Sequence, residues 1–241
     1  EVLGLSQAIY DTKNALNGEQ RLATEKSKDL KLIKVLKDLN KAQLEDVTNK
    51  VNAANTLTEL SQLTQSTLEL NDKMKLLRDQ LKTLVNPVKA SLNYRNADYN
   101  LKRQFNKALK EAKGVLNKNS GTNVNINDIQ HLLTQIDNAK DQLNGEQRLK
   151  EHQQKSEVYV IKELDILNNA QKAAIINQIR ASKDIKMINQ IVDNAIELDD
   201  AMQSLKEHVT QLTATTKDNI EYLNADEDLK LQYDYAINLA N

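Results

Sequence analysis

Residues 60–84 read LSQLTQSTLELNDKMKLLRDQLKTL, and this stretch decides the fold of the 241-residue chain. Apolar or small residues recur in alternating steps of three and four, which is the seam of an amphipathic helix. The seam residues are Leu60, Leu63, Thr67, Leu70, Met74, Leu77, Leu81 and Leu84. At a rise of about 1.5 Å per residue, the stretch predicts a helix roughly 40 Å long. We expect it to cover 56–85 and to end at Asn86-Pro87.

The same seam occurs again, because Leu60 corresponds to Ile188, a shift of 128 residues. The second seam consists of Ile188, Ile191, Ala195, Leu198, Met202, Leu205, Val209 and Leu212. It predicts a second long helix over 184–212.

The whole chain repeats itself. Leu16-Asn-Gly-Glu-Gln-Arg-Leu22 recurs as Leu143-Asn-Gly-Glu-Gln-Arg-Leu149, and Tyr94-Arg-Asn-Ala-Asp98 corresponds to Tyr222-Leu-Asn-Ala-Asp226. The first pair is shifted by 127 residues and the second by 128, so we expect one residue to be gained between Leu149 and Val158. A unit of about 127 residues is a tandem-repeat period. We interpret the chain as a window on a longer array.

Two further segments repeat with the shift of 128. Leu39-Asn-Lys-Ala-Gln43 corresponds to Leu167-Asn-Asn-Ala-Gln171, and Leu70-Asn-Asp-Lys-Met74 to Leu198-Asp-Asp-Ala-Met202.

Shorter helices are predicted around the first seam. Helices over 22–38 and 41–53 can form a three-helix bundle with the first half of the long helix, and helices over 97–118 and 127–143 can form another with its second half. The inward positions are Leu30, Ile33, Leu36, Leu44, Val47 and Val51 in the first bundle, and Leu101, Phe105, Ala108, Leu109, Val115, Leu116, Ile129, Leu132, Ile136 and Leu143 in the second. The predicted fold class is therefore all-α: an elongated rod of tandem three-helix bundles joined by long shared helices. The sequence leaves open whether helix continues through Asn17-Gly18 and Asn144-Gly145.

Composition argues against several classes of function. The 33 Lys and Arg balance 34 Asp and Glu, so the basic excess typical of nucleic-acid-binding proteins is missing. The sequence contains no run of 18 apolar residues, so it predicts no membrane span in this fragment. The chain contains no cysteine, which excludes disulfides, thiolate metal sites and a cysteine nucleophile.

The side chains that could carry chemistry favour a structural interpretation. His131, His152 and His208 show no metal-ligand spacing, and the carboxylates are spread along what we expect to be solvated helix faces. We therefore expect no enzyme activity, catalytic residue, metal or cofactor.

The repeated Tyr-x-Asn-Ala-Asp element invites a binding interpretation, but helix capping explains it better. The capping and turn residues proposed on this basis are Tyr94, Asp98, Tyr222 and Asp226.

Taken together, the Leu-Asn-Gly-Glu, Leu-Asn-x-Ala-Gln, Leu-x-Asp-x-Met and Tyr-x-Asn-Ala-Asp motifs resemble the tandem GA-like and FIVAR repeats of the giant staphylococcal extracellular-matrix-binding surface protein family. The resemblance covers nearly the whole chain. It implies the end of a FIVAR module at 1–17, GA-like modules at 22–70 and 149–197, a FIVAR module at 71–142 and a truncated FIVAR module at 198–241.

The resemblance also implies a bacterial cell-surface adhesin that binds fibronectin or another host matrix protein. Albumin, the ligand of related GA modules, is a poor fit, because the corresponding faces present Asn49, Lys50, Asn52 and Thr58, and Asn177, Gln178, Arg180 and Lys186. No ligand-binding residue can be named from the sequence, and we expect a monomer.

Two other functions stay open. The first is a purely structural spacer at the cell surface, whose repeats bind no ligand. The second is a spectrin-like cytoskeletal rod, against which the unit length and the absence of tryptophan argue.

Overall fold

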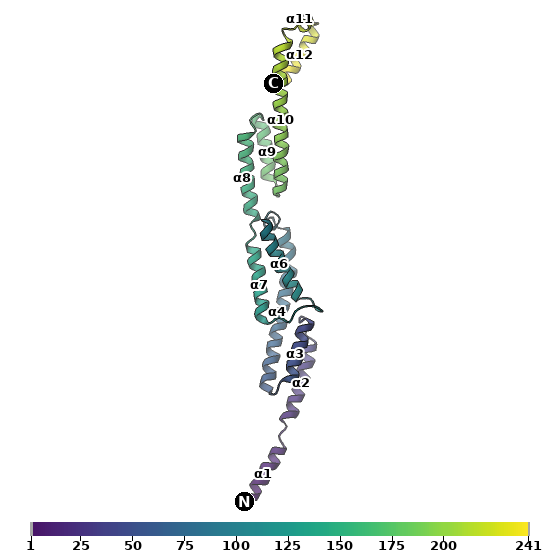
Figure 1. The fold of residues 1–241 in the computed structure, drawn as a ribbon, viewed down its shortest axis with the longest axis vertical. Helices are drawn as coiled ribbons and strands as arrows, with labels where there is room; N and C mark the ends of the chain where they lie inside the picture. The colour runs from purple at the N-terminus through teal and green to yellow at the C-terminus, as the bar shows by residue number, and fades with distance from the viewer. Residues whose placement is uncertain (1, 241) are drawn as a thin grey trace. The chain divides into compact units, whose positions relative to one another are not determined.

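The computed structural model describes residues 2–240, which form helices joined by turns, with no strand among them (Figure 1). In chain order the helices are α1 (Val2–Asn14), α2 (Gly18–Lys34), α3 (Lys41–Ala53), α4 (Leu57–Ala90), α5 (Leu92–Arg95), α6 (Tyr99–Val115), α7 (Ile126–Asp141), α8 (Gly145–Glu163), α9 (Asn169–Ala181), α10 (Ile185–Thr216), α11 (Ile220–Leu223) and α12 (Glu227–Ala240). The all-α fold class predicted from the sequence is confirmed. The predicted module limits at Glu1 and Asn241 lie outside the described residues.

The helices fall into two units. The first unit contains the described residues through Ser91 and then Asp98–Leu143; the second contains Leu92–Ala97 and the described residues from Asn144 onward.

In the first unit, α2, α3 and the beginning of α4 pack together as a three-helix bundle. Its buried core consists of Ile33, Val47, Val51, Ala54 and Leu60, with Leu22, Leu30, Leu44 and Leu63 packed against it. Asn40 begins α3 with a capping box, because its side chain accepts from the backbone of Gln43 while the Gln43 side chain accepts from the backbone of Asn40.

The remainder of α4 packs with α6 and α7 in a second bundle of the same unit. The core comprises Met74, Leu77, Leu81, Phe105, Ala108, Leu109, Ala112, Ile129, Leu133 and Ile136. Figure 1 shows α4 passing from one bundle to the other. One helix therefore contributes its seam to two cores.

The two bundles of the first unit also meet through their loops. Asn40 is fully buried, and its side-chain nitrogen donates to the carbonyl oxygens of Val115, at 3.0 Å, and Thr122, at 2.9 Å. The ammonium group of Lys118 donates to the carbonyl oxygen of Leu39 at 3.0 Å. Burial lowers the pKa of Lys118, and the nearby charge of Arg78 adds to the effect.

The predicted end of the long helix at Asn86-Pro87 is wrong, because α4 continues through Pro87 to Ala90. Proline removes the hydrogen bond of its own nitrogen, while its carbonyl oxygen can still accept. Here the carbonyl oxygen of Pro87 accepts from the backbone of Ser91 at 3.1 Å. Pro87 therefore leaves only one hydrogen bond of the helix unmade, the one that its own nitrogen would donate.

In the second unit, α8, α9 and the beginning of α10 form a three-helix bundle around Leu149, Val160, Leu164, Leu167, Ile175, Ile179, Ile188 and Ala195. The residues Leu92–Ala97 belong to this unit, and α5 packs against α8. Beyond the bundle α10 continues, and α12 packs against it.

Helix does not continue through either Asn-Gly pair. The helix α1 ends at Asn14 and α2 begins at Gly18, while α7 ends at Asp141 and α8 begins at Gly145. The glycine is thus the first residue of a new helix in both copies.

The extra residue of the second copy lies later than expected. Val160, which is fully buried, corresponds to the buried Ile33 with the shift of 127, and Leu167 corresponds to the buried Leu39 with the shift of 128. The insertion therefore falls between Val160 and Leu167, near the end of α8, and not before Val158.

Candidate functional site

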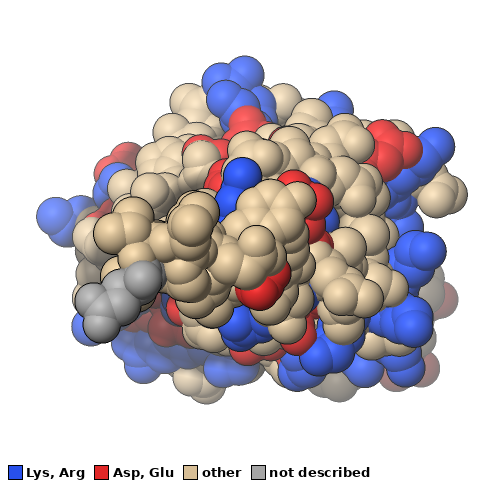
Figure 2. Space-filling model, turned by 90° about the horizontal axis from the view of Figure 1, so that it is seen from below, with Lys and Arg blue, Asp and Glu red and all other residues tan. Residues whose placement is uncertain are grey.

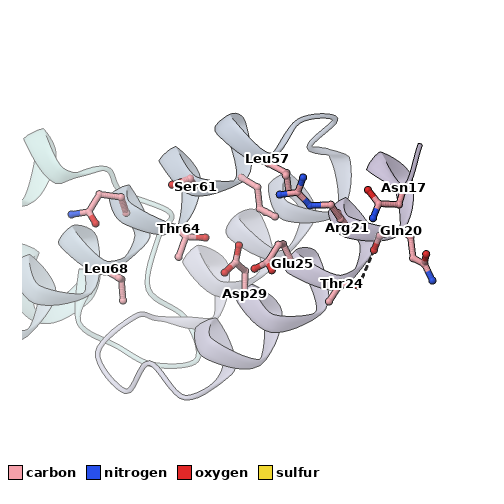
Figure 3. A pocket seen from close by; sticks show the side chains of 12 residues that line it. Asn17, Gln20, Arg21, Thr24, Glu25, Asp29, Leu57, Ser61, Thr64 and Leu68 are labelled. Carbon is pink, nitrogen blue, oxygen red and sulfur yellow. Dashed lines mark hydrogen bonds between the residues drawn. The ribbon is translucent and has the colours of Figure 1, made fainter. Parts of the chain in front are cut away.

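In the first unit, an open groove of about 640 Å³ lies between α2 and α4. From α2 and the residue before it, Figure 3 shows Asn17, Gln20, Arg21, Thr24, Glu25 and Asp29; from α4 it shows Leu57, Ser61, Thr64 and Leu68. The lining is mainly polar, which distinguishes this groove from the apolar pockets that hold most small ligands.

The charged side chains of the groove do not form a catalytic arrangement. Glu25 forms an ion pair with Lys28 at 2.6 Å on the same helix, and neither histidine nor cysteine lines the groove. Arg21 lies near Leu57, and Asp29 lies further along α2 (Figure 3). The groove can offer hydrogen bonds and charges of both signs to a polar segment of another protein.

The second unit has an equivalent but shorter groove of about 290 Å³ between α8 and α10. It is lined by His152, Lys155, Ser156, Tyr159, Asn189, Val192 and Asp193. His152 corresponds to Glu25, and Asn189 corresponds to Ser61, so the same two helix faces form the groove in both copies.

The groove of the second unit is shorter because Leu92–Ala97 covers its end. A methyl group placed on Gly145 would lie 2.6 Å from the carbonyl oxygen of Leu92 and from the nitrogen of Ala97, and closer still to the carbonyl oxygen of Asn93. Only glycine allows so close an approach of the backbone. A methyl group on the corresponding Gly18 would have no neighbour within 4 Å among the described residues.

Hydrogen bonds hold this covering segment in place. The backbone nitrogen of Ile185 donates to the side-chain oxygen of Asn96 at 3.0 Å, and the Asn96 side-chain nitrogen donates to the carbonyl oxygen of Lys183 at 3.1 Å. Arg148 donates to the carbonyl oxygen of Asn96 at 2.7 Å, and Asn96 is only 4% exposed. Asn96 therefore satisfies a free backbone donor at the start of α10.

The seam residues predicted from the sequence differ between the two copies. Leu60, Leu70, Met74, Leu77 and Leu81 are buried on α4, and Leu63 is half-buried. On α10, Ile188 and Val209 are buried, and Ile191 and Met202 are half-buried.

Of the other seam residues of α10, Ala195 is buried, whereas Leu198, Leu205 and Leu212 are more accessible. Leu198 is 39% exposed and Leu205 is 41% exposed, whereas Leu77, the counterpart of Leu205, is fully buried.

The expected capping and turn residues lie in or directly before the helices α5, α6, α11 and α12. Asp98 occupies the N-cap position of α6 without a capping hydrogen bond from its side chain, so the predicted side-chain cap is not formed there. Tyr94 lies in α5, and Asp226 precedes α12 and accepts from the backbone of Lys230 through its carbonyl oxygen. Tyr222 donates from its hydroxyl group to Asp234 at 3.0 Å.

The described residues hold no group of three or more His, Cys, Asp or Glu side chains that could bind a metal ion. Among residues 2–240, no helix is long and apolar enough to span a bilayer. On the face drawn in Figure 2, Lys and Arg side chains are interspersed with Asp and Glu.

The sequence did not predict this groove, because the resemblance to GA modules placed the expected binding surface on the second and third helices of each bundle. The groove lies between the first and third helices instead. One signal pointed to the covered end of the groove in the second unit: Leu-Asn-Gly-Glu-Gln-Arg-Leu is repeated exactly, and its glycine at a helix start allows close approach of another backbone, as at Gly145.

Comparisons with known proteins agree with the two kinds of bundle. Residues 19–73 and 146–201 match the GA module family, and residues 74–144 and 201–241 match the FIVAR domain family.

The chain is similar to the "Extracellular matrix-binding protein ebh" of Staphylococcus aureus strain MW2, with 32% identity over 96% of this chain. It is also similar to the "Extracellular matrix-binding protein EbhA" of strain Mu3, with 31% identity over 96% of this chain. The chain spans only 2% and 3% of the lengths of these relatives.

Among solved structures, the crystal structure of EbhA residues 756–1003 from Staphylococcus aureus superposes with a TM-score of 0.72. The sequence identity is 24%, and the match covers 78% of this chain and 76% of the other. This likeness shows a common fold.

Proposed function

We propose, since the chain belongs to the family of tandem GA and FIVAR repeats of staphylococcal extracellular matrix-binding proteins, that it serves as a non-enzymatic adhesive segment at a bacterial cell surface. The ligand that we propose is a host matrix protein, with fibronectin as the first candidate. The observation that supports this proposal is the similarity over 96% of the chain to relatives named for matrix binding.

The surface chemistry favours weak binding by each repeat. The groove between α2 and α4 is mainly polar, and Asn49, Lys50 and Asn52 on α3 are exposed. High-affinity interfaces usually rest on a few buried aromatic or apolar anchors. Firm attachment would then come from many linked repeats, because each bound repeat raises the effective concentration of the next.

The polar surface of the repeats argues against albumin as the ligand. It also favours one alternative function, that of a spacer, because a repeat without an apolar anchor is suited to act as one. In that case α4 and α10 would serve only to connect successive bundles within each unit.

Binding to immobilised fibronectin and to immobilised albumin separates these functions. We expect the chain to bind fibronectin with a dissociation constant in the micromolar range, and a genetic fusion of two copies to bind at least about tenfold more tightly. We expect no binding to albumin. Failure of both constructs to bind fibronectin at several hundred micromolar would favour the spacer.

A pair of charge-reversal variants locates the binding surface. Glu25→Lys combined with Asp29→Lys changes the groove, while Glu45→Lys combined with Glu69→Lys makes the same change in charge on exposed positions outside it. Loss of fibronectin binding in the first double variant alone would assign the groove.

A further inference from the structure

The balanced charge of the whole chain hides one basic bundle. Residues 71–143, which supply α6, α7 and the larger part of α4, contain 13 Lys and Arg against 7 Asp and Glu. Residues 19–70 contain 8 of each kind, and so do residues 146–197. The excess of positive charge in the first unit therefore belongs to the bundle of α4, α6 and α7.

Most of this excess lies on one helix. The sequence of α6 contains a single carboxylate, Glu111, among five cations. The cations are Lys102, Arg103, Lys107, Lys110 and Lys113.

Four of these cations lie on the side of α6 that is turned away from the core. Arg103, Lys107, Lys110 and Lys113 are exposed, whereas Phe105, Ala108, Leu109 and Ala112 are buried. The four cations follow one another in steps of four, three and three residues, so each lies about 4.5–6 Å further along the helix axis. They form a cationic line about 15 Å long on the outer face of α6.

Ion pairs leave most of this charge unneutralised. Lys107 lies 3.8 Å from Glu111, and both side chains are exposed. Arg103, Lys110 and Lys113 form no ion pair with the described residues. An exposed pair such as the one at Lys107 is weak, so its lysine can still attract a second anion.

Helix stability does not explain the cationic line. Positive charge stabilises a helix near its C-terminal end, which suits Lys113. The first turn of α6, however, contains Lys102 and no carboxylate, which is the opposite of what the helix dipole favours.

The second copy of this helix forms without these charges. The counterparts of Arg103, Lys107 and Lys110 with the shift of 128 are Leu231, Tyr235 and Asn238 of α12. The helix itself therefore does not require the cations, which leaves binding as their role.

The exposure of the cationic line does not depend on where the given sequence begins or stops. The bundle of α4, α6 and α7 has all three of its helices. In the sequence, one GA module precedes it and another follows it.

We propose that the outer face of α6 binds a sulfated polysaccharide of the host matrix, which lies along the cationic line. Such a polymer is narrow and carries anions at short intervals, as the line carries cations. Arg103 can hold a sulfate group through two parallel hydrogen bonds, and each lysine can hold one as a point charge.

This site goes beyond a protein ligand and lies outside the groove of Figure 3. Only the origin of the polymer in the host matrix rests on the proposed function. Binding of the polymer itself is tested without fibronectin, so the two proposals can fail independently.

Nucleic acids fit this surface less well. A duplex is wider than one helix and would extend over α7, which packs against α6 and is mainly acidic. The charged residues of α7 are Asp128, Asp137, Lys140 and Asp141. Single-stranded nucleic acids bind through aromatic side chains on which their bases stack, and Tyr99 is the one exposed aromatic residue of α6.

Binding of the full chain to immobilised heparin tests the proposal. We expect a dissociation constant in the micromolar range at about 50 mM salt. The logarithm of the binding constant should fall with the logarithm of the salt concentration with a slope of about −2 to −3. Each neutralised anion of a single-stranded polyanion releases about 0.7 of a counterion, and the line offers four cations.

A matched pair of variants locates the site. Lys110→Gln combined with Lys113→Gln should weaken heparin binding at least about tenfold, because it removes half of the cationic line. Lys150→Gln combined with Lys162→Gln removes two exposed charges from α8 and should leave binding unchanged. Circular dichroism should show the same helix content in both, since Lys and Gln have similar helix propensities. Equal weakening in the two double variants would overturn the proposal.

A second pair of variants predicts a gain of affinity. Glu111→Gln removes the single carboxylate of α6 and should tighten heparin binding about two- to fivefold, because it removes repulsion of the polymer. Glu163→Gln removes an exposed carboxylate from α8 and should have no effect. The same gain in both variants would contradict a site on α6.

Two other polymers test the chemistry of the ligand. Hyaluronate, which has no sulfate and fewer anions along its length, and duplex DNA should both bind at least about tenfold more weakly than heparin. Binding of either one as tightly as heparin would overturn the choice of a sulfated polysaccharide. Failure to bind heparin at several hundred micromolar chain and low salt would overturn the site.

Discussion

The side-chain nitrogen of Asn40 donates a hydrogen bond of 3.0 Å to the carbonyl oxygen of Val115, which lies 75 residues further along the chain. The same nitrogen reaches Thr122, while the side-chain oxygen caps α3. Asn168, the counterpart of Asn40, forms the same capping box at the start of α9 but is exposed. Asn168 therefore only caps its helix, whereas Asn40 caps its helix and also bonds the two distant carbonyl oxygens.

This difference predicts unequal effects of the same substitution. Asn168→Ala should destabilise its bundle by about 1 kcal/mol, the usual loss for an N-cap. Asn40→Ala should destabilise its unit by about 3 kcal/mol, because the carbonyl oxygens of Val115 and Thr122 also lose their donor. Hydrogen exchange of the backbone amides measures both values. Equal losses in the two variants would show that the bonds to Val115 and Thr122 contribute no stability.

The two repeated glycines should likewise differ. Gly145→Ala should destabilise the second unit by about 1–3 kcal/mol, since the new methyl group meets the backbone of Leu92–Ala97. Gly18→Ala should be neutral or stabilising by up to about 1 kcal/mol, since a methyl group there meets no neighbour within 4 Å among the described residues.

Urea denaturation followed by amide signals of α2 and α8 distinguishes the two glycine variants. Destabilisation of similar size in both would contradict the assignment of close packing to Gly145 alone.

The contact of α12 with α10 should depend on pH. Lys217 lies 2.8 Å from the Asp234 carboxylate and, with the Tyr222 hydroxyl, holds the pKa of Asp234 below its ordinary value of 3.8. A lowered pKa means that the charged form stabilises the folded state above pH 3.8. The contribution is then lost as the pH falls from 3.8 through the lower pKa of the folded state.

Carbon NMR of the Asp234 carboxyl group tests this dependence. Replacing Lys217 with Met should raise the pKa of Asp234 toward 3.8. Lys230→Met, which removes a cation that pairs with Glu227 instead, should change it little. A pKa of Asp234 that is the same in the wild type and in the Lys217→Met variant would contradict the assignment.

Much of the fold could be predicted from local pattern. The seam from Leu60 to Leu84 occurs twice without Gly or Pro, and helix periodicity alone identifies both long helices. The end of α4 could not be predicted in this way. Proline lowers the local preference for helix, but the surrounding tertiary structure decides whether the helix continues through it.

The local sequence pattern could not predict the groove or the segment that covers its end. The Tyr-x-Asn-Ala-Asp motif indicated capping, yet the helix that Asn96 caps is α10, which begins 89 residues later. Sequence spacing cannot identify a partner so distant. The accessibility of Leu205 could not be predicted either. Its seam is as regular as that of Leu77, which is buried, and burial depends on whether a third helix packs against the seam.

Hydrogen exchange of the Thr67→Pro variant tests most directly the claim that one helix serves two bundles. Proline at this buried position of α4 should cost about 3 kcal/mol or more. Amide protection should fall together in α2 and α3 and in α6 and α7, whereas Ala195→Pro should leave all four helices protected. Loss of protection in only one of the two bundles of the Thr67→Pro variant would contradict the shared helix.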